Sequence, residues 1–286
     1  MPTLLIIFSN LIDNKAMSVK RWKIDTNAGQ LLFDREFALV NSSGVALRLS
    51  QYPKMCLIRP IINLETMVLE VSAPGHLKLL IDLGKRCTNS IREIKVCGIK
   101  CGGNLWGDHD VSAWFTEYLG VQCWLARSQQ GKYSLPQHAD SNVHKRGGFS
   151  NEAPLLLISK TSISSLNQVL KDQGSKLVNP KHFRPNFVVA TDNGDDTRNP
   201  EDLWKLVKFT DNELELSVTG QCARCSMVDI DPDSGMKGKT LRALSEYRRN
   251  RGQITFGIFL QISLPSKKLP ATQWVVCGQV LEAVSR

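Results

Sequence analysis

Short aliphatic and β-branched runs recur along the chain, and they constrain its fold more than any other feature. Clusters of Gly, Asn, Asp and Pro separate these runs. Turn residues that close each short apolar run are typical of β-barrels and β-sandwiches. We therefore predict a mainly β protein. The clearest runs are Phe37 to Val40, Met67 to Val71, Leu155 to Ile158, Phe187 to Val189 and Ile254 to Ile262.

Three segments depart from this pattern and show apolar residues three or four positions apart, which predicts a few short helices. They run from Val111 to Leu119, from Ile163 to Leu170 and from Leu241 to Tyr247. Asp108 or Asp110 is expected to cap the first helix. Gly120 is expected to end the first helix, and Gly174 the second.

The chain has 286 residues, of which 42% are hydrophobic, so it can bury a substantial core in one large or two ordinary domains. Its formal net charge of +9 favours phosphate-bearing ligands, nucleic acid or anionic membranes. The basic residues are dispersed, and the densest cluster is Tyr247 to Arg251. Because no zinc-finger spacing, basic zipper or aromatic RNA-binding signature is present, we expect no nucleic-acid partner.

Eight cysteines spread over a long chain without a secretory signal indicate reduced thiols and a cytoplasmic protein. The apolar start Leu4 to Phe8 lacks a basic flank and is too short to span a bilayer. No other stretch is long enough. We therefore expect no membrane association.

The densest candidate site is the run from Gly220 to Gly235, in which Cys222 and Cys225 lie three positions apart. A zinc site would need two more ligands, and a redox dithiol would need a strand-to-helix context. Two half-buried strand cysteines are a further alternative. The functional interpretation is that one thiolate beside Arg224 acts as a soft metal ligand or a sulfur nucleophile.

The run from Cys222 to Gly235 closely resembles the cysteine motif of MOSC domains, whose second cysteine binds molybdenum. The resemblance implies that Cys225 is the metal ligand and the catalytic residue, with Cys222 as its companion. The Asn-Glu-Ala and Cys-x-Arg-Cys versions of the motifs resemble molybdenum cofactor sulfurases more than amidoxime reductases. Further segments resemble the family in the same order: Leu31 to Phe37, Leu49 to Ile58 (similar to a strand), Ser150 to Ile158, Phe183 to Val189 and Gly252 to Gly257.

The implied cofactor is the molybdenum cofactor, a pterin with a terminal phosphate and a dithiolene that holds the metal. Guanidinium groups suit its phosphate, and a soft thiolate suits its metal. We expect Arg35, Arg184 and Cys225 to meet at a basic crevice between two β-rich units. Taken singly, Arg35 is also compatible with a surface pair with Asp34, Arg184 with a strand edge, and the asparagines with turns. The expected cofactor-binding residues are Arg35, Asn151, Arg184, Asn186 and Arg224.

The resemblance implies a β-barrel MOSC domain at 149–286 and a smaller N-terminal β-barrel-like domain at 15–128, joined by a linker loop at 129–148. Residues 1–14 are expected to be an atypical, truncated start. Ile12 and Asp13 stand where the family has a Lys and a Ser that help to hold the cofactor. Pyridoxal phosphate is expected only on an upstream domain that this chain is too short to contain.

The function implied by the resemblance is molybdenum cofactor binding and sulfuration, as part of a molybdenum cofactor sulfurtransferase. The exchange of Mo=O for Mo=S would then serve xanthine dehydrogenase or aldehyde oxidase as partner. Two alternatives stay open. One is an amidoxime-reductase-like molybdenum oxidoreductase, which would reduce N-hydroxylated substrates, and the other is a non-catalytic carrier of the cofactor.

Overall fold

A computed structural model describes residues 3–8, 21–85, 91–128, 149, 153–191, 197–263 and 269–285 of the chain. The linker expected at 129–148 lies outside the described residues. The strands are β1 (Thr3–Phe8), β2 (Arg21–Asp25), β3 (Gln30–Leu31), β4 (Phe37–Val40), β5 (Arg59–Asn63), β6 (Val68–Ser72), β7 (Leu79–Asp82), β8 (Ile91–Val96), β9 (Ile99–Leu105), β10 (Trp124–Ser128), β11 (Leu155–Ser159), β12 (Phe187–Thr191), β13 (Trp204–Phe209), β14 (Glu215–Ala223), β15 (Arg249–Asn250), β16 (Gln253–Ile262), β17 (Thr272–Val276) and β18 (Val280–Ser285).

The helices are α1 (His109–Leu119), α2 (Lys160–Asp172) and α3 (Thr240–Arg248), with short 3-10 helices η1 (Pro53–Leu57), η2 (Pro180–Phe183), η3 (Pro200–Leu203) and η4 (Ser226–Asp229). Strands dominate the described part of the chain, which confirms the prediction of a mainly β fold with a few short helices. No helix among the described residues is long and apolar enough to cross a membrane.

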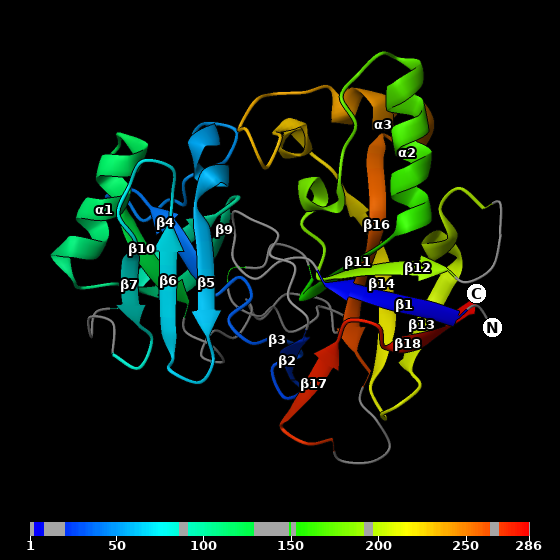
Figure 1. Ribbon diagram of the computed structural model, residues 1–286, viewed down its shortest axis with the longest axis horizontal. Coiled ribbons are helices and arrows are strands. Elements are labelled where there is room, and N and C mark those ends of the chain that lie inside the picture. Colours follow the sequence, from blue (N-terminus) through cyan, green and yellow to red (C-terminus); the bar gives the residue numbers. More distant parts are fainter. Residues whose placement is uncertain are drawn as a thin grey trace.

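The second half of the chain, together with β1, builds a closed barrel in the order β11, β12, β1, β18, β13, β14 and β16, with β16 pairing back onto β11. Neighbouring strands are antiparallel except β11 and β12, whose parallel pairing requires the crossover that α2 supplies. Both faces of β11 are buried. Leu155 and Leu157 pack in the barrel core, and Ile158 packs beneath α2 and α3 (Figure 1).

The strand β1 is contributed by the first residues of the chain and lies between β12 and β18 in this barrel. Its residues Thr3–Phe8 fall inside the segment 1–14 that the sequence sets apart as an atypical start. The barrel is therefore built from both ends of the chain, and Figure 1 shows the two termini close together at its right-hand side.

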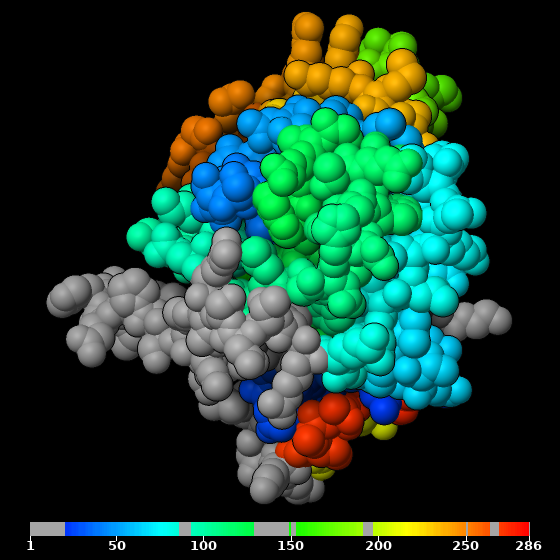
Figure 2. Space-filling model, turned by 90° about the vertical axis from the view of Figure 1, so that its left-hand side faces the viewer, coloured from blue at the N-terminus to red at the C-terminus, as the bar shows by residue number. Residues whose placement is uncertain are grey.

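The N-terminal unit consists of the sheet β4-β10-β9-β8, the sheet β5-β6-β7 and α1. Figure 2 faces the outside of this unit, where the green segment that includes α1 covers the middle of the view. Buried side chains of this unit, such as Phe37 and Phe115, belong to the same apolar cluster as the barrel residues Leu157 and Ile258. The third small sheet, β17-β2-β3, also joins both halves of the chain. The two units therefore share one hydrophobic core.

The three helices lie where the apolar spacing predicts them. Gly120 ends α1 in the left-handed conformation with φ of 70°, and its N–H donates to the carbonyl of Thr116 at 2.8 Å. Asp108 is the N-cap residue of α1, although its side chain makes no capping hydrogen bond. Gly174 follows α2 with φ of 60°.

One segment differs from the sequence-based expectation, and a second buries a carboxylate. The segment from Leu49 to Ile58, expected to resemble a strand, forms turns and η1, because Pro53 occupies the first turn of a 3-10 helix. The polar stretch that precedes β13 contains η3 with a fully buried Glu201. The carboxylate of Glu201 accepts hydrogen bonds from the hydroxyls of Ser159 and Ser162 at 2.6–2.7 Å. Burial raises the pKa of Glu201, and the serine hydrogen bonds lower it in part.

A β-bulge in β16 lies where this strand passes the end of β14. Gln221 pairs with Ile258 and Ala223 pairs with Thr255, so β16 carries one extra residue between these pairs. Gly257 lies in this extra stretch with φ of +76°. A β-carbon at this position would lie 2.6 Å from Cγ1 of Ile158 and 2.8 Å from the carbonyl oxygen of Leu157. Barrel closure at β11 and β16 therefore requires glycine here.

Replacing Gly257 with alanine should lower the free energy of unfolding by roughly 2–4 kcal/mol, because it adds both left-handed strain and a steric clash. Gly278→Ala is the matched control, since Gly278 has φ of 89° and its β-carbon would meet nothing within 4 Å. In the control, the free energy of unfolding should fall by only about 1–2 kcal/mol, because Gly278→Ala adds left-handed strain without a clash. Urea unfolding followed by circular dichroism measures both. Equal losses would contradict the requirement for close packing at Gly257.

Candidate functional site

A cavity of about 270 Å³ lies between the N-terminal unit and the barrel. Side chains from β4, η1 and β8 of the N-terminal unit line one wall, and residues of η2, the end of β14 and η4 line the other. Apolar residues form much of the surface. The described lining residues include five Lys or Arg side chains and four cysteines but no Asp or Glu. The cavity therefore suits an anionic ligand with a partly apolar body.

Cys225 lies where β14 gives way to η4. The strand ends at Ala223, the N–H of Arg224 donates to the carbonyl of Ile254 at 2.7 Å, and Cys225 is the extended N-cap residue of η4. Cys225 is exposed and lines the cavity, whereas Cys222 is buried with only 6% of its surface accessible. Of this pair, Cys225 is thus the thiol that a ligand can reach freely.

Arg224 connects three segments around the cavity. Its Nε and Nη2 donate to the carbonyl oxygen of Phe256 at 2.9 and 2.7 Å, and its Nη1 donates to the carbonyl oxygen of Phe183 at 3.0 Å. The guanidinium also lies over the Phe183 ring, with 5.3 Å between its carbon atom and the ring centroid. Phe256 belongs to the bulge of β16, and Phe183 immediately precedes Arg184. Arg224 therefore fixes the backbone on both sides of the site.

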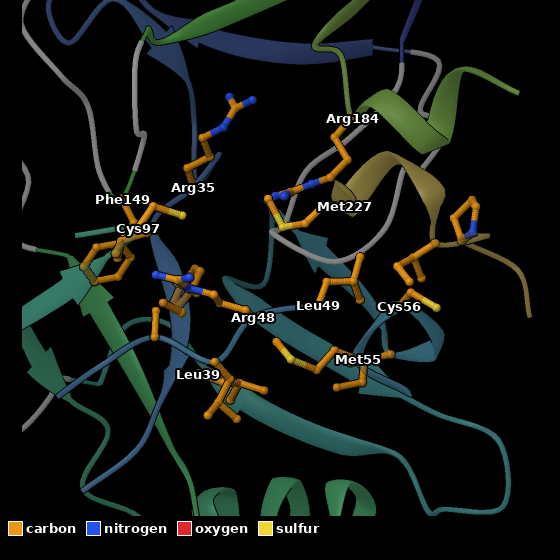
Figure 3. Close-up of a pocket in the computed structure, with 18 of the residues that line it drawn as sticks. Arg35, Leu39, Arg48, Leu49, Met55, Cys56, Cys97, Phe149, Arg184 and Met227 are labelled. Carbon is orange, nitrogen blue, oxygen red and sulfur yellow. The ribbon is translucent and has the colours of Figure 1, made fainter. Parts of the chain in front are cut away.

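Arg184 follows η2 and reaches the cavity from a left-handed backbone conformation with φ of 54°. The helical turn before it is held by a capping box, in which Asn179 and His182 satisfy each other's backbone N–H groups. Figure 3 shows the side chain of Arg184 extending into the cavity toward Met227. A non-glycine residue in this conformation is uncommon and is found at sites that position a functional group.

Arg35 and Asn186 join the two units at the edge of the cavity. Nη1 of Arg35 donates to Oδ2 of Asp34 at 2.6 Å, to Oδ1 of Asn186 at 3.2 Å and to the carbonyl oxygen of Pro154 at 3.3 Å. The fully buried Asn186 also donates to Asp34 at 2.7 Å and accepts from the N–H of Leu156 at 2.8 Å. Figure 3 shows the Arg35 guanidinium directed away from Arg48 and Leu49. The polar groups of this joint are thus engaged within the protein.

The structure brings four of the five expected cofactor-binding residues to this region. Arg35, Arg184 and Arg224 line the cavity together with Cys225. Asn186 lies behind the lining, where it contacts Arg35. Asn151 lies outside the described residues, and its role stays a prediction.

Two lining residues were missed by sequence reasoning. Arg48 lies in the turn before η1, and Cys97 lies at the tip of the β8–β9 hairpin with φ of 49°. Figure 3 shows both on the part of the cavity contributed by the N-terminal unit. No local motif surrounds either residue, so only the docking of the two units reveals them.

The segment that follows Cys225 docks onto the N-terminal unit. The thiol of Cys56 donates to the carbonyl oxygen of Asp231 at 3.4 Å, and Arg59 lies 3.5 Å from the carboxylate of Asp233. Gly235 turns here with φ of 73°, where a β-carbon would lie 3.3 Å from the carbonyl oxygen of Pro53. Burial, together with the charges of Asp231 and Asp233, raises the pKa of Cys56 to about 11. Cys56 is therefore a protonated structural thiol at neutral pH.

The carboxylate of Asp231 organises this docking segment. It accepts hydrogen bonds from the N–H groups of Asp233 and Ser234 at 2.8 and 3.0 Å, and from the ammonium of Lys176. Burial raises the pKa of Asp231, but the hydrogen bonds from Lys176, Asp233 and Ser234 outweigh it and lower the pKa to about 2. The ionised carboxylate is thus the form that holds the turn.

Comparison with known proteins identifies the class of this fold and site. The MOSC domain family matches residues 144–282, and the MOSC N-terminal beta barrel domain family matches residues 14–122. The chain therefore belongs to the MOSC-domain proteins that carry both domains. The N-terminal unit and the barrel described above correspond in sequence to these two matches.

The relatives are more specific than the domain families. The chain is 33% identical over 283 residues to a molybdenum cofactor sulfurase of Oryza sativa subsp. japonica, covering 93% of this chain and 33% of the relative. It is 32% identical to the proteins of the same name from Aspergillus niger, over 85% of this chain and 36% of the relative, and from Arabidopsis thaliana, over 92% and 33%. The chain thus spans about a third of the length of these relatives.

The pH dependence of stability should report on Asp231. Its folded pKa of about 2 lies below the ordinary value of 3.8, so its stabilising contribution is complete above about pH 4 and is lost as the pH falls toward 2. Asp231→Asn should therefore be less stable at neutral pH and should show a flatter loss of stability between pH 4 and 2. Lys176→Met should shift the loss of stability to higher pH, because it removes the cation that lowers the pKa of Asp231. Urea midpoints measured from pH 5 to 2 decide this, and identical slopes for wild type and Asp231→Asn would disprove the role of this carboxylate.

Proposed function

We propose that this chain binds the molybdenum cofactor in the cavity between its two domains and presents it for sulfuration. One observation carries the proposal: an exposed thiol and several cations face a single cavity whose described lining contains no carboxylate. The cofactor is an anionic pterin whose metal is held by soft sulfur ligands, so its chemistry matches this set of donors. The likeness to proteins named molybdenum cofactor sulfurase supports the same ligand.

Cys225 is proposed as the protein ligand to molybdenum, because its sulfur is a soft donor that is open to the cavity. The guanidinium of Arg184 presents a planar fork of N–H donors that fits an anionic oxygen of the ligand. Arg224 positions both residues, since it is adjacent to Cys225 in the chain and holds the carbonyl that precedes Arg184. Arg35 and Asn186 act indirectly by joining the walls of the cavity, and Asn151 remains a proposed contact.

Bound cofactor supplies the metal centre that receives sulfur, while the protein residues bind and orient it. A sulfurtransferase activity requires a sulfur donor, which we propose to be a pyridoxal-phosphate-dependent domain outside this chain. Xanthine dehydrogenase and aldehyde oxidase apoenzymes are the proposed recipients, and the cytoplasm is the proposed compartment. The binding step of this sequence is the one that we propose for the residues of this chain.

Replacing Cys225 and Cys222 by serine, one at a time, distinguishes the roles of the two thiols. Cys225→Ser replaces a soft ligand with a hard hydroxyl, so molybdenum retained per chain should fall about tenfold or more. Cys222→Ser is the matched control and should retain most of the metal, because Cys222 is buried and its thiol contacts the carbonyl of Ala223 at 3.6 Å. The measurement is molybdenum and pterin content after loading under reducing conditions.

Three outcomes would contradict the assignment. Equal loss in both variants would indicate two equivalent sulfurs, as in a zinc site or a redox dithiol. Full retention by Cys225→Ser would remove Cys225 as the ligand. Greater sensitivity of Cys222 would mean that the other cysteine binds the metal.

A further inference from the structure

The cations of the cavity differ in whether the protein itself engages them. Arg35 and Arg224 donate to fixed oxygen atoms of the joint and of the bulge, and Nζ of Lys181 lies 3.7 Å from the carboxylate of Asp233. Arg48 is different. Among the described residues, no hydrogen bond or ion pair engages its side chain, although it lines the cavity. Its charge is thus available to a ligand.

The backbone that carries Arg48 is anchored on both sides. The N–H of Leu47 donates to the carbonyl of Leu39 at 2.8 Å, and the carbonyl of Arg48 accepts from the N–H groups of Gln51 and Tyr52 at 3.0 and 2.9 Å. The side chain therefore projects from a defined turn. It stands among apolar lining residues that include Leu39, Leu49 and Met55 (Figure 3). The side chain of Arg48 is exposed, so an anion that enters the cavity can reach its guanidinium.

The position of Arg48 also distinguishes it from the other ligand-binding candidates. Cys225 and Arg184 belong to the barrel, whereas Arg48 belongs to the N-terminal domain. A ligand that contacts both walls can place an anionic group at Arg48. No described Asp or Glu lines the cavity to compete for that contact.

We propose that Arg48 is a ligand-binding residue, which pairs with a phosphate-type oxyanion of the molecule held by Cys225. The proposal rests on the function proposed above and extends it, because it assigns the N-terminal domain a direct part in anion recognition. The guanidinium offers two N–H donors to two oxygens of the phosphate, a geometry that lysine cannot reproduce. The contact joins the two domains through the ligand.

Arg48→Ala, Arg48→Lys and the control Arg242→Ala test this inference on the full chain. Arg242 is exposed on α3, lies outside the cavity lining and carries the same charge. Each variant is loaded with molybdenum cofactor, and the pterin retained per chain is measured by fluorescence after oxidation. Orthophosphate is titrated in parallel by calorimetry. Arg48→Ala should weaken both interactions roughly ten- to a hundredfold, as expected for loss of a charged hydrogen bond. Arg48→Lys should be intermediate, and Arg242→Ala should match wild type.

The outcomes separate this inference from the function on which it rests. If wild type and Arg48→Ala retain pterin equally, Arg48 is not a ligand contact, whereas the proposed function stands. If wild type retains no pterin, the proposed function fails, and the orthophosphate titration alone judges Arg48. Weaker phosphate binding by Arg48→Ala than by Arg242→Ala then supports an anion site. Equal binding, or no binding by wild type, overturns it. Thermal unfolding by circular dichroism confirms that each variant is folded.

Discussion

The guanidinium of Arg224 is the contact on which the geometry of the site depends. It holds the carbonyl of Phe256 in the β16 bulge and the carbonyl of Phe183 at the end of η2. Cys225 follows it directly in the chain, and Arg184 follows Phe183. One side chain therefore sets the distance between the proposed metal ligand and the proposed anion-binding arginine. The bulge contributes to this arrangement, because Gly257 lets β16 pass close to β11 beside the carbonyl that Arg224 uses. Barrel closure and the shape of the site are consequences of the same local backbone.

The cavity exists only where the two domains meet. In addition to the sheet β17-β2-β3, two sets of contacts among the described residues hold them together: the joint of Asp34, Arg35 and Asn186, and the docking of Asp231 to Gly235 onto η1. The second set lies on the same chain segment as Cys225, only a few residues further on. Any separation of the domains would displace the thiol as well as the opposite wall. The shared hydrophobic core opposes such separation, since large side chains of both domains pack in one cluster.

The sequence predicts the mainly β fold, its helices and several residues that line the cavity, but not the orientation of the side chains. Strand runs and the stop at Gly120 depend on local backbone preference, which a single sequence carries. Arg35 shows the limit: its residue type suits a phosphate, yet its guanidinium binds Asp34 and Asn186, a residue 151 positions away in the chain. Arg48 and Cys97 are the opposite case. No sequence motif marks either residue as part of a site, and both line the cavity only because the two domains dock. Glu201 stands in a polar stretch but is buried, since Ser159 and Ser162 supply hydrogen bonds from a distant helix start.

The distribution of charge around the cavity adds to the net charge of +9 by concentrating cations at one place. The carboxylates nearest the site are turned toward cations behind its walls. Asp34 pairs with Arg35, Glu36 pairs with Arg127 at 2.5 Å, and Asp231 pairs with Lys176. Burial raises the pKa of Glu36, and its ion pair with Arg127 offsets part of this rise. Arg48 and Arg184 face the opposite way, into a lining without described carboxylates. The described lining therefore carries an excess of positive charge, which favours an anionic ligand.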